Sequence, residues 1–131
     1  MPVISAFYAA LAGLLCAALS VMVISHRFGK AISLGDGGDP VMSRAVRVFG
    51  HFVEYAPLII VLLILAEMLG VSRTSLHVYG AAFVLSRISH AIGLYRTPKP
   101  NIFRFLGVTA TLAVLVGLAI SLLFVTLPKI G

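Results

Sequence analysis

The segment RVFGHFVEYAP, from Arg47 to Pro57, opens a run that soon becomes wholly apolar, APLIIVLLILA over residues 56–66. Its polar side chains recur at the spacing i, i+4, i+7 and i+8 of one helix face, and they are Arg47, His51, Glu54 and Tyr55. Such groups are costly to expose to lipid, so in a membrane helix they normally face a bundle interior or a wet cavity. This segment therefore predicts a membrane helix that carries a functional site.

The composition of the whole chain indicates an integral membrane protein. Of 131 residues, 60% are hydrophobic and only 11% are charged, whereas a soluble domain carries roughly a quarter charged residues. The formal charge of +6 does not indicate a nucleic-acid partner, because so few other residues are polar. The single cysteine, Cys16, cannot form an intramolecular disulfide, and the N-terminus lacks the basic region of a signal peptide. One membrane domain over residues 1–131, with a retained first span, is expected.

Apolar runs separated by turn-forming residues predict an all-α bundle of four membrane-spanning helices, at about 3–25, 41–69, 76–95 and 102–127. Asp39 or Ser43 is expected to cap the second helix and Asn101 the fourth, while Gly70 ends the second. Pro57 is expected to kink or loosen the second helix. Glu67 is expected at the membrane boundary. Small residues form one stripe at Ala9, Gly13 and Ala17 and another at Thr109, Ala113, Gly117 and Ser121. The first stripe is interpreted equally well as a close packing face, for example between subunits, and as the ordinary abundance of Ala and Gly in membrane spans.

The distribution of basic residues predicts the topology. Four spans place the first and third connections on one side of the membrane and both termini on the other. Of ten Lys and Arg residues, Arg73 and Lys129 fall on the side of the termini, which leaves eight on the side of the first and third connections. The positive-inside rule therefore predicts that these connections are cytoplasmic and that both termini are outside, in the inner membrane if the protein is bacterial.

This topology predicts one cation-rich cavity near the cytoplasmic boundary. In the third helix a shared face carries Phe83, Arg87, His90 and Leu94. The polar groups expected at similar depth are Arg27, the segment from Arg47 to Tyr55, Arg87, His90 and Arg104. The positive charge of the cavity favours an anionic ligand that arrives from the cytoplasm. The Glu54 carboxylate indicates that this ligand also carries a cationic group. The depth favours a second, lipophilic ligand that arrives from the membrane lipid.

The motifs in these helices resemble those of one family. Arg47-x3-His51-x2-Glu54-Tyr55-x-Pro57 resembles the second-helix signature of the MAPEG family, the membrane-associated proteins of eicosanoid and glutathione metabolism. Arg87-x2-His90-x2-Gly93 resembles its third-helix motif, and Pro98-Lys99-Pro100-Asn101 resembles the loop before the fourth helix of microsomal glutathione transferases. The resemblance, to a small bacterial member of this kind, implies a homotrimer that binds glutathione between neighbouring subunits near the cytoplasmic face.

The resemblance also implies roles for individual residues in glutathione binding. Arg47 would bind a glutathione carboxylate, Glu54 the γ-glutamyl ammonium, and Tyr55 would add a hydrogen bond. Arg87 and His90 would line the same pocket from the third helix, and Arg27 matches an arginine that lies close to the thiol in the family. His51 would contribute a hydrogen bond to the ligand. His51 departs from the pattern, because asparagine is usual at its position.

The implied chemistry is attack by a glutathione thiolate, as co-substrate, on a lipophilic electrophile or hydroperoxide. A nearby guanidinium favours thiolate over thiol, and the catalytic candidates are Arg104, which is favoured for its place in a helix first turn, and Arg96. No metal is expected, because the chain lacks the dense histidine pairs of membrane metalloenzymes.

Simpler interpretations remain open beside the enzyme. A direct bond between Arg47 and Glu54 is not expected, because two helical turns separate them, so each is predicted to bind another helix or a ligand. Arg87 could instead snorkel toward the interface. A non-catalytic protein with the MAPEG fold is the second hypothesis, which the departure at His51 keeps open. A small transporter is a distant third, because four-helix exporters often carry a carboxylate in the first span and this span has none.

Overall fold

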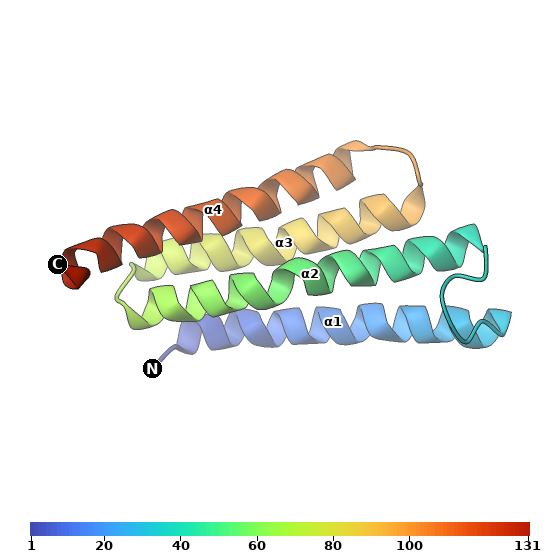
Figure 1. Cartoon of the computed structure of the whole chain (residues 1–131), viewed down its shortest axis with the longest axis horizontal. Coiled ribbons are helices and arrows are strands. Elements are labelled where there is room, and N and C mark those ends of the chain that lie inside the picture. The colour runs from blue at the N-terminus through green and yellow to red at the C-terminus, as the bar shows by residue number, and fades with distance from the viewer.

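The computed structural model describes residues 1–131 as four antiparallel helices, α1 (Val3–Lys30), α2 (Pro40–Met68), α3 (Arg73–Arg96) and α4 (Ile102–Ile130). The α1–α2 and α3–α4 connections lie at one end of the bundle, and both termini and the α2–α3 turn lie at the other (Figure 1). The predicted helices are confirmed, and the largest difference is that α1 continues past Ser25 to Lys30. The bundle therefore places the basic-rich first and third connections at the same end.

The helix ends follow from local sequence. Asp39 caps α2, because its Oδ1 accepts bonds from the backbone N–H groups of Val41 at 2.9 Å and Met42 at 2.8 Å. Asn101 caps α4 by accepting a bond from the backbone N–H of Arg104 at 3.0 Å. Gly70 follows α2 with φ of +87°, a left-handed conformation that glycine adopts readily. The caps at Asp39 and Asn101 are confirmed, and Ser43 is not the cap.

Three helices, α1, α2 and α4, are long and apolar enough to cross a membrane. The sequence predicted four such spans, and α3 is the exception, because its polar side chains lower its hydropathy. Three of them, Ser86, Arg87 and His90, are buried, and α3 packs against α1, α2 and α4. These three polar residues of α3 are therefore directed into the bundle and not toward lipid.

The N-terminus of α1 is capped by a side chain from another helix. Pro2 precedes α1 and provides no side-chain hydrogen bond. Glu67, near the end of α2, accepts bonds from the backbone N–H groups of Ile4 at 2.9 Å and Ser5 at 2.7 Å, and also from the Ser5 hydroxyl. A carboxylate at this position satisfies free N–H groups and complements the helix dipole. Glu67 thus fastens α1 to α2, a contact that the sequence did not predict.

Replacing Glu67 by glutamine should loosen this end of the bundle. The amide loses the negative charge at the helix N-terminus, and we expect the unfolding free energy to fall by about 1 kcal/mol. Thermal unfolding in detergent, followed by circular dichroism, measures the change. Glu54→Gln is the matched control, because it alters an exposed ion pair, and such pairs contribute little to stability. If Glu67→Gln and Glu54→Gln lowered the unfolding free energy equally, Glu67 would not act as the cap of α1.

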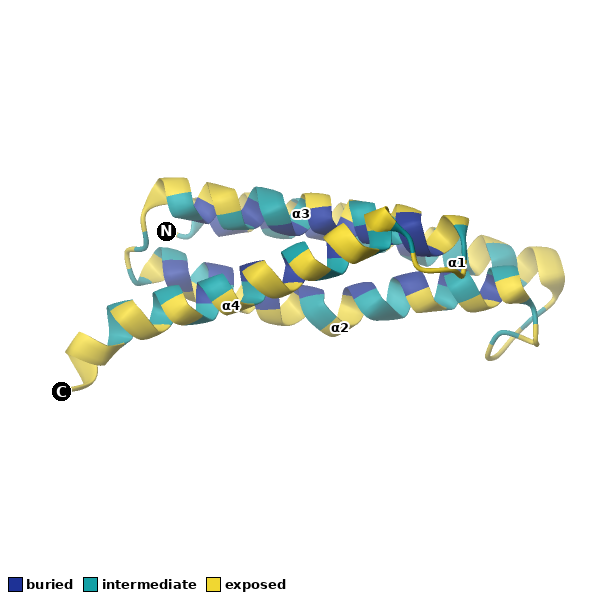
Figure 2. Ribbon diagram, turned by 90° about the horizontal axis from the view of Figure 1, so that it is seen from above, coloured by how far each residue is buried: buried dark blue, intermediate teal, exposed yellow.

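The two small-residue stripes have different surroundings. Gly13 and Ala17 on α1 are exposed, and a Cβ atom at Gly13 would meet nothing within 4 Å. On α4, by contrast, Gly117 and Ser121 pack against Tyr79, whose hydroxyl lies 2.9 Å from that of Ser121. Beyond Leu118 no residue of α4 is buried, and the exposed ends of α4 and α1 project from the bundle (Figure 2). Gly13 and Ala17 of the α1 stripe are therefore not packed against another helix of the subunit.

Candidate functional site

The predicted polar face of α2 divides into an outer and an inner half. Arg47 and Glu54 are exposed, whereas His51 and Tyr55 are half-buried. At about 100° per residue, positions 47 and 54 are nearly aligned, and positions 51 and 55 turn progressively away from them. The four residues therefore share a face as predicted, but its two edges have different surroundings.

Arg47 and Glu54 form a direct ion pair, with 3.1 Å between Nη1 and Oε1. The expectation that two helical turns would keep them apart was wrong, because the two long side chains extend toward each other along the helix surface. Their side chains remain 57% and 50% exposed. A cation and an anion thus face outward from a membrane helix, and within the subunit each has only the other as a charged partner.

A polar pocket of about 450 Å³ lies beside this pair. It lies between the α1–α2 connection and the first turns of α2, and its lining residues are Gly35, Asp36, Ser43, Val46, Arg47 and Gly50. The backbone N–H of Gly38 donates to Asp36 at 3.0 Å. This bond and one from the Ser43 hydroxyl hold the pKa of Asp36 below its usual value. The pocket therefore presents one carboxylate and one guanidinium.

The inner half of the face belongs to a buried network around Arg87, which is 2% exposed. Its Nη1 donates to Nδ1 of His51 at 2.9 Å, and its Nη2 donates to the Thr111 hydroxyl at 2.5 Å and to the Gly107 carbonyl at 3.4 Å. Because a guanidinium has only donors, Nδ1 of His51 must accept, which places the His51 proton on Nε2. This burial excludes the alternative that Arg87 snorkels toward the interface.

Stacked rings complete the inner network. His51 stacks on His90 with 4.0 Å between ring centroids and on Tyr55 with 5.0 Å, and the Arg87 guanidinium lies 5.8 Å from the centre of the Tyr55 ring. No carboxylate pairs with Arg87, and the buried Nε of Arg87 and Nε2 of His90 have no hydrogen-bond partner. Arg87 and His90 therefore lie deeper in the bundle than His51. His51 contacts both of them and lies between them and the outer residues Arg47 and Glu54.

The remaining predicted site residues lie apart from one another. Arg27 donates through Nη1 to the carbonyls of Gly35 at 3.0 Å and Ile32 at 3.5 Å, and it lines a pocket that does not include Arg47. Arg104 is half-buried in the first turn of α4, whereas Arg96 is exposed at the end of α3. One subunit therefore does not gather all the predicted residues into a single cavity.

Sequence reasoning missed the α4 side of the Arg87 network. Thr111 also bonds to the Ser86 hydroxyl at 2.9 Å and to the Gly107 carbonyl at 2.8 Å. The buried face of α4 carries Gly107, Thr111, Val114 and Leu118, which is offset from the predicted stripe that begins at Thr109. The available signal was the four-residue spacing of Gly107 and Thr111, which brings a small and a hydrogen-bonding residue opposite an arginine-bearing helix.

The fold and these residues define a helical membrane protein with a buried polar core and an outward-facing ion pair at its basic end. The profile of the MAPEG family matches residues 5–124, and the chain belongs to this family. The chain is 35% identical, over 92 residues and 70% of each chain, to the inner membrane protein YecN of Escherichia coli strain K12. The protein of the same name from Escherichia coli O6:H1 matches to the same extent.

Proposed function

We propose that this MAPEG protein is a membrane-embedded glutathione transferase or peroxidase whose glutathione site is built on Arg47 and Glu54. The observation that carries the proposal is the exposed ion pair beside a polar pocket, on a helix apolar enough to cross a membrane. Exposed charges on such a helix need a polar partner. Membership of a family that includes glutathione transferases supports this choice of partner.

The ion pair complements the γ-glutamyl end of glutathione. That end carries a carboxylate and an ammonium on the same carbon atom, and Arg47 and Glu54 hold opposite charges 3.1 Å apart. Arg47 would bind the carboxylate, with the planar geometry that arginine offers to carboxylates, and Glu54 would bind the ammonium. The Tyr55 hydroxyl, which makes no hydrogen bond in the subunit, would add a third contact. The polar pocket lined by Arg47 and Gly50 leaves room for the rest of the tripeptide.

An arginine would then hold the thiol as thiolate. Arg104 is the first candidate and Arg96 the second, because no carboxylate neutralises either guanidinium and a cation lowers the pKa of a nearby thiol. The thiolate would attack the electrophilic carbon of a lipophilic substrate, and a thioether would form as the bond between that carbon and its leaving group breaks. With a hydroperoxide it would yield an alcohol and a sulfenic acid, which a second glutathione converts to the disulfide and water. Holding both reactants at the membrane boundary supplies much of the rate.

A homotrimer would complete the site between subunits. The exposed Arg47–Glu54 pair and the unpartnered stripe at Gly13 and Ala17 lie on outer surfaces of the subunit, where small residues allow helices to approach closely. Arg27 lines a different pocket of the same subunit, so the role beside the thiol implied for it would require a neighbouring subunit. We propose an inner-membrane location with cytoplasmic basic connections, supported by the name of the relative and by the eight basic residues at that end.

Binding of glutathione to the detergent-solubilised protein tests the site. We expect Arg47→Ala and Glu54→Gln each to weaken binding by about tenfold, which corresponds to one lost charge-assisted contact. An analogue without the α-amino group should bind the wild type more weakly than glutathione does, and Glu54→Gln should bind the two ligands equally.

Arg73→Ala is the control, because Arg73 is exposed at the opposite end of the bundle. Unchanged affinity in Arg47→Ala, or a Glu54→Gln variant that still prefers the ammonium-bearing ligand, would contradict the assignment.

Ultraviolet absorbance of the thiolate separates the enzyme from a non-catalytic binding protein. Arg104→Ala should reduce the thiolate signal more than it reduces affinity, and an unchanged signal would move this role to Arg96. The non-catalytic alternative is favoured by one observation: His51, where asparagine is usual in the family, is already engaged by Arg87. Binding without a thiolate signal in the wild type would select that alternative.

A further inference from the structure

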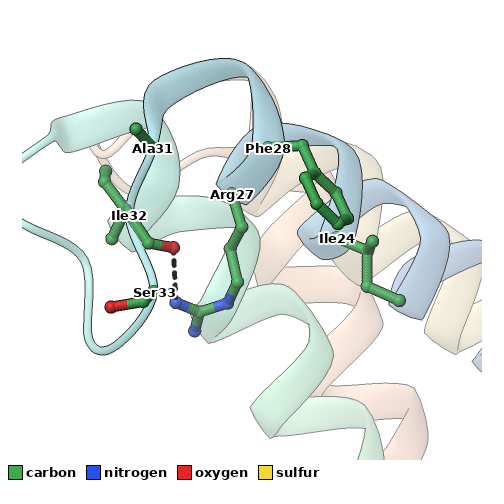
Figure 3. Close-up of a pocket in the computed structure, with 6 residues that line it drawn as sticks. All are labelled: Ile24, Arg27, Phe28, Ala31, Ile32 and Ser33. Carbon is green, nitrogen blue, oxygen red and sulfur yellow. Dashed lines mark hydrogen bonds between the residues drawn. The ribbon is translucent and has the colours of Figure 1, made fainter.

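A second pocket, of about 530 Å³, lies at the basic end of α1, and neither Arg47 nor Glu54 lines it. Its lining residues are Ile24, Arg27, Phe28, Ala31, Ile32 and Ser33 (Figure 3). Ile24 and Phe28 lie on one side of the Arg27 side chain, and Ile32 and Ser33 lie on the other. The pocket is therefore an apolar recess with one guanidinium at its centre.

The end of α1 forms this recess by reversing the chain. Ala31 has φ of 53°, and the backbone N–H of Ile32 donates to the Arg27 carbonyl at 3.1 Å, so the chain folds back beside the last helical turn. Arg27 fixes the connection in this position through its Nη1 bonds to the Gly35 and Ile32 carbonyls.

Arg27 retains donors for an anion. Its two hydrogen bonds both use Nη1, and no carboxylate lies within ion-pair distance of it. Its neighbour Lys30 differs, because Lys30 pairs with Asp39 at 2.5 Å. The positive charge of Arg27 is therefore available to a bound group, whereas that of Lys30 is balanced within the subunit.

The apolar walls of the pocket indicate the kind of molecule to which the bound anionic group belongs. Phe28 is 85% exposed and Ile24 is 50% exposed, and both stand on the last turns of a helix with no charged side chain before Arg27. An apolar surface followed by a cation matches the boundary between acyl chains and phosphates in a bilayer. A small water-soluble anion would bind Arg27 and leave these apolar walls uncovered. An anionic phospholipid from the surrounding membrane would contact both Arg27 and the apolar walls.

We propose that this pocket binds one anionic phospholipid, with its phosphate on Arg27 and an acyl chain against Ile24 and Phe28. The inference does not rest on the proposed function, because the binding is measured without glutathione. A protein that binds glutathione but not lipid would refute this inference alone, and the reverse result would refute the proposed function alone.

Native mass spectrometry of the detergent-solubilised protein, titrated with phosphatidylglycerol or phosphatidylcholine of the same chain length, tests the proposal. The wild type should retain phosphatidylglycerol more tightly, and Arg27→Gln should reduce that preference by about tenfold, as expected for one charge-assisted contact. Phe28→Ser should weaken the binding of both lipids, and it should fold, because Phe28 is 85% exposed.

Two matched controls should behave as the wild type. Leu34→Ser changes an equally exposed residue that does not line the pocket, and Arg73→Gln removes an arginine from the opposite end of the bundle. The proposal is overturned by equal losses in these controls, by an undiminished preference in Arg27→Gln, or by inorganic phosphate displacing the lipid. It is also overturned if Phe28→Ser dissociates an oligomer, because a second copy of the chain would then occupy the pocket.

Discussion

Arg87→Ala is expected to lower the free energy of unfolding by about 3 kcal/mol or more. The substitution empties the volume of a side chain that is 2% exposed. It also removes the donor to Nδ1 of His51 and one of the bonds to Thr111, and a buried acceptor that loses its partner is costly. Unfolding of the detergent-solubilised protein by a denaturing detergent, followed by circular dichroism, measures the loss.

Arg87→Met separates volume from charge. Methionine fills much of the same space without a buried cation, and Arg87 has no carboxylate partner to be left behind. Replacing a buried charge by a well-packed apolar side chain is often neutral or stabilising, so we expect less than half of the loss seen with alanine. A methionine variant as unstable as the alanine variant would show that the guanidinium hydrogen bonds, and not packing, hold α3 to α4.

Gly107→Ala should have an effect of similar size at the contact between α3 and α4. A Cβ atom at Gly107 would lie 2.6 Å from both the Cβ and the backbone N of His90, and 2.7 Å from the Ser86 carbonyl oxygen. These are mostly backbone atoms, so the helices must separate, and overpacking of this kind costs about 1–3 kcal/mol or occasionally more. Because Arg87 also bonds to the Gly107 carbonyl, the displacement should disturb the network around His51. The unfolding measurement used for Arg87 applies here.

Gly50→Ala is the stability control for Gly107→Ala. Both residues are helical glycines, but a Cβ atom at Gly50 meets nothing within 4 Å, and alanine is the better helix former by about 1 kcal/mol. We therefore expect Gly50→Ala to keep or raise the stability. If both variants lost stability equally, the close approach of α3 and α4 would not be the cause.

The sequence by itself determined the architecture of this protein, because helix formation depends on local spacing and caps. Apolar runs, Asp39, Gly70 and Asn101 placed four helices within three residues of their observed bounds, apart from the end of α1. The spacing within α3 also predicted the face that carries Phe83, Arg87, His90 and Leu94, and all four are buried. The motifs on α2 and α3 pointed to the family to which the chain belongs.

Only the tertiary structure decided how the polar residues are partnered. It paired Arg47 with Glu54, buried Arg87 against Thr111, and placed the Glu67 carboxylate at the N-terminus of α1. It also assigned Arg27 and Arg47 to separate pockets. Helical spacing gives the angle at which a residue leaves its own helix. The partner that it meets depends on the rotation and depth of the neighbouring helices, which packing across the whole bundle sets.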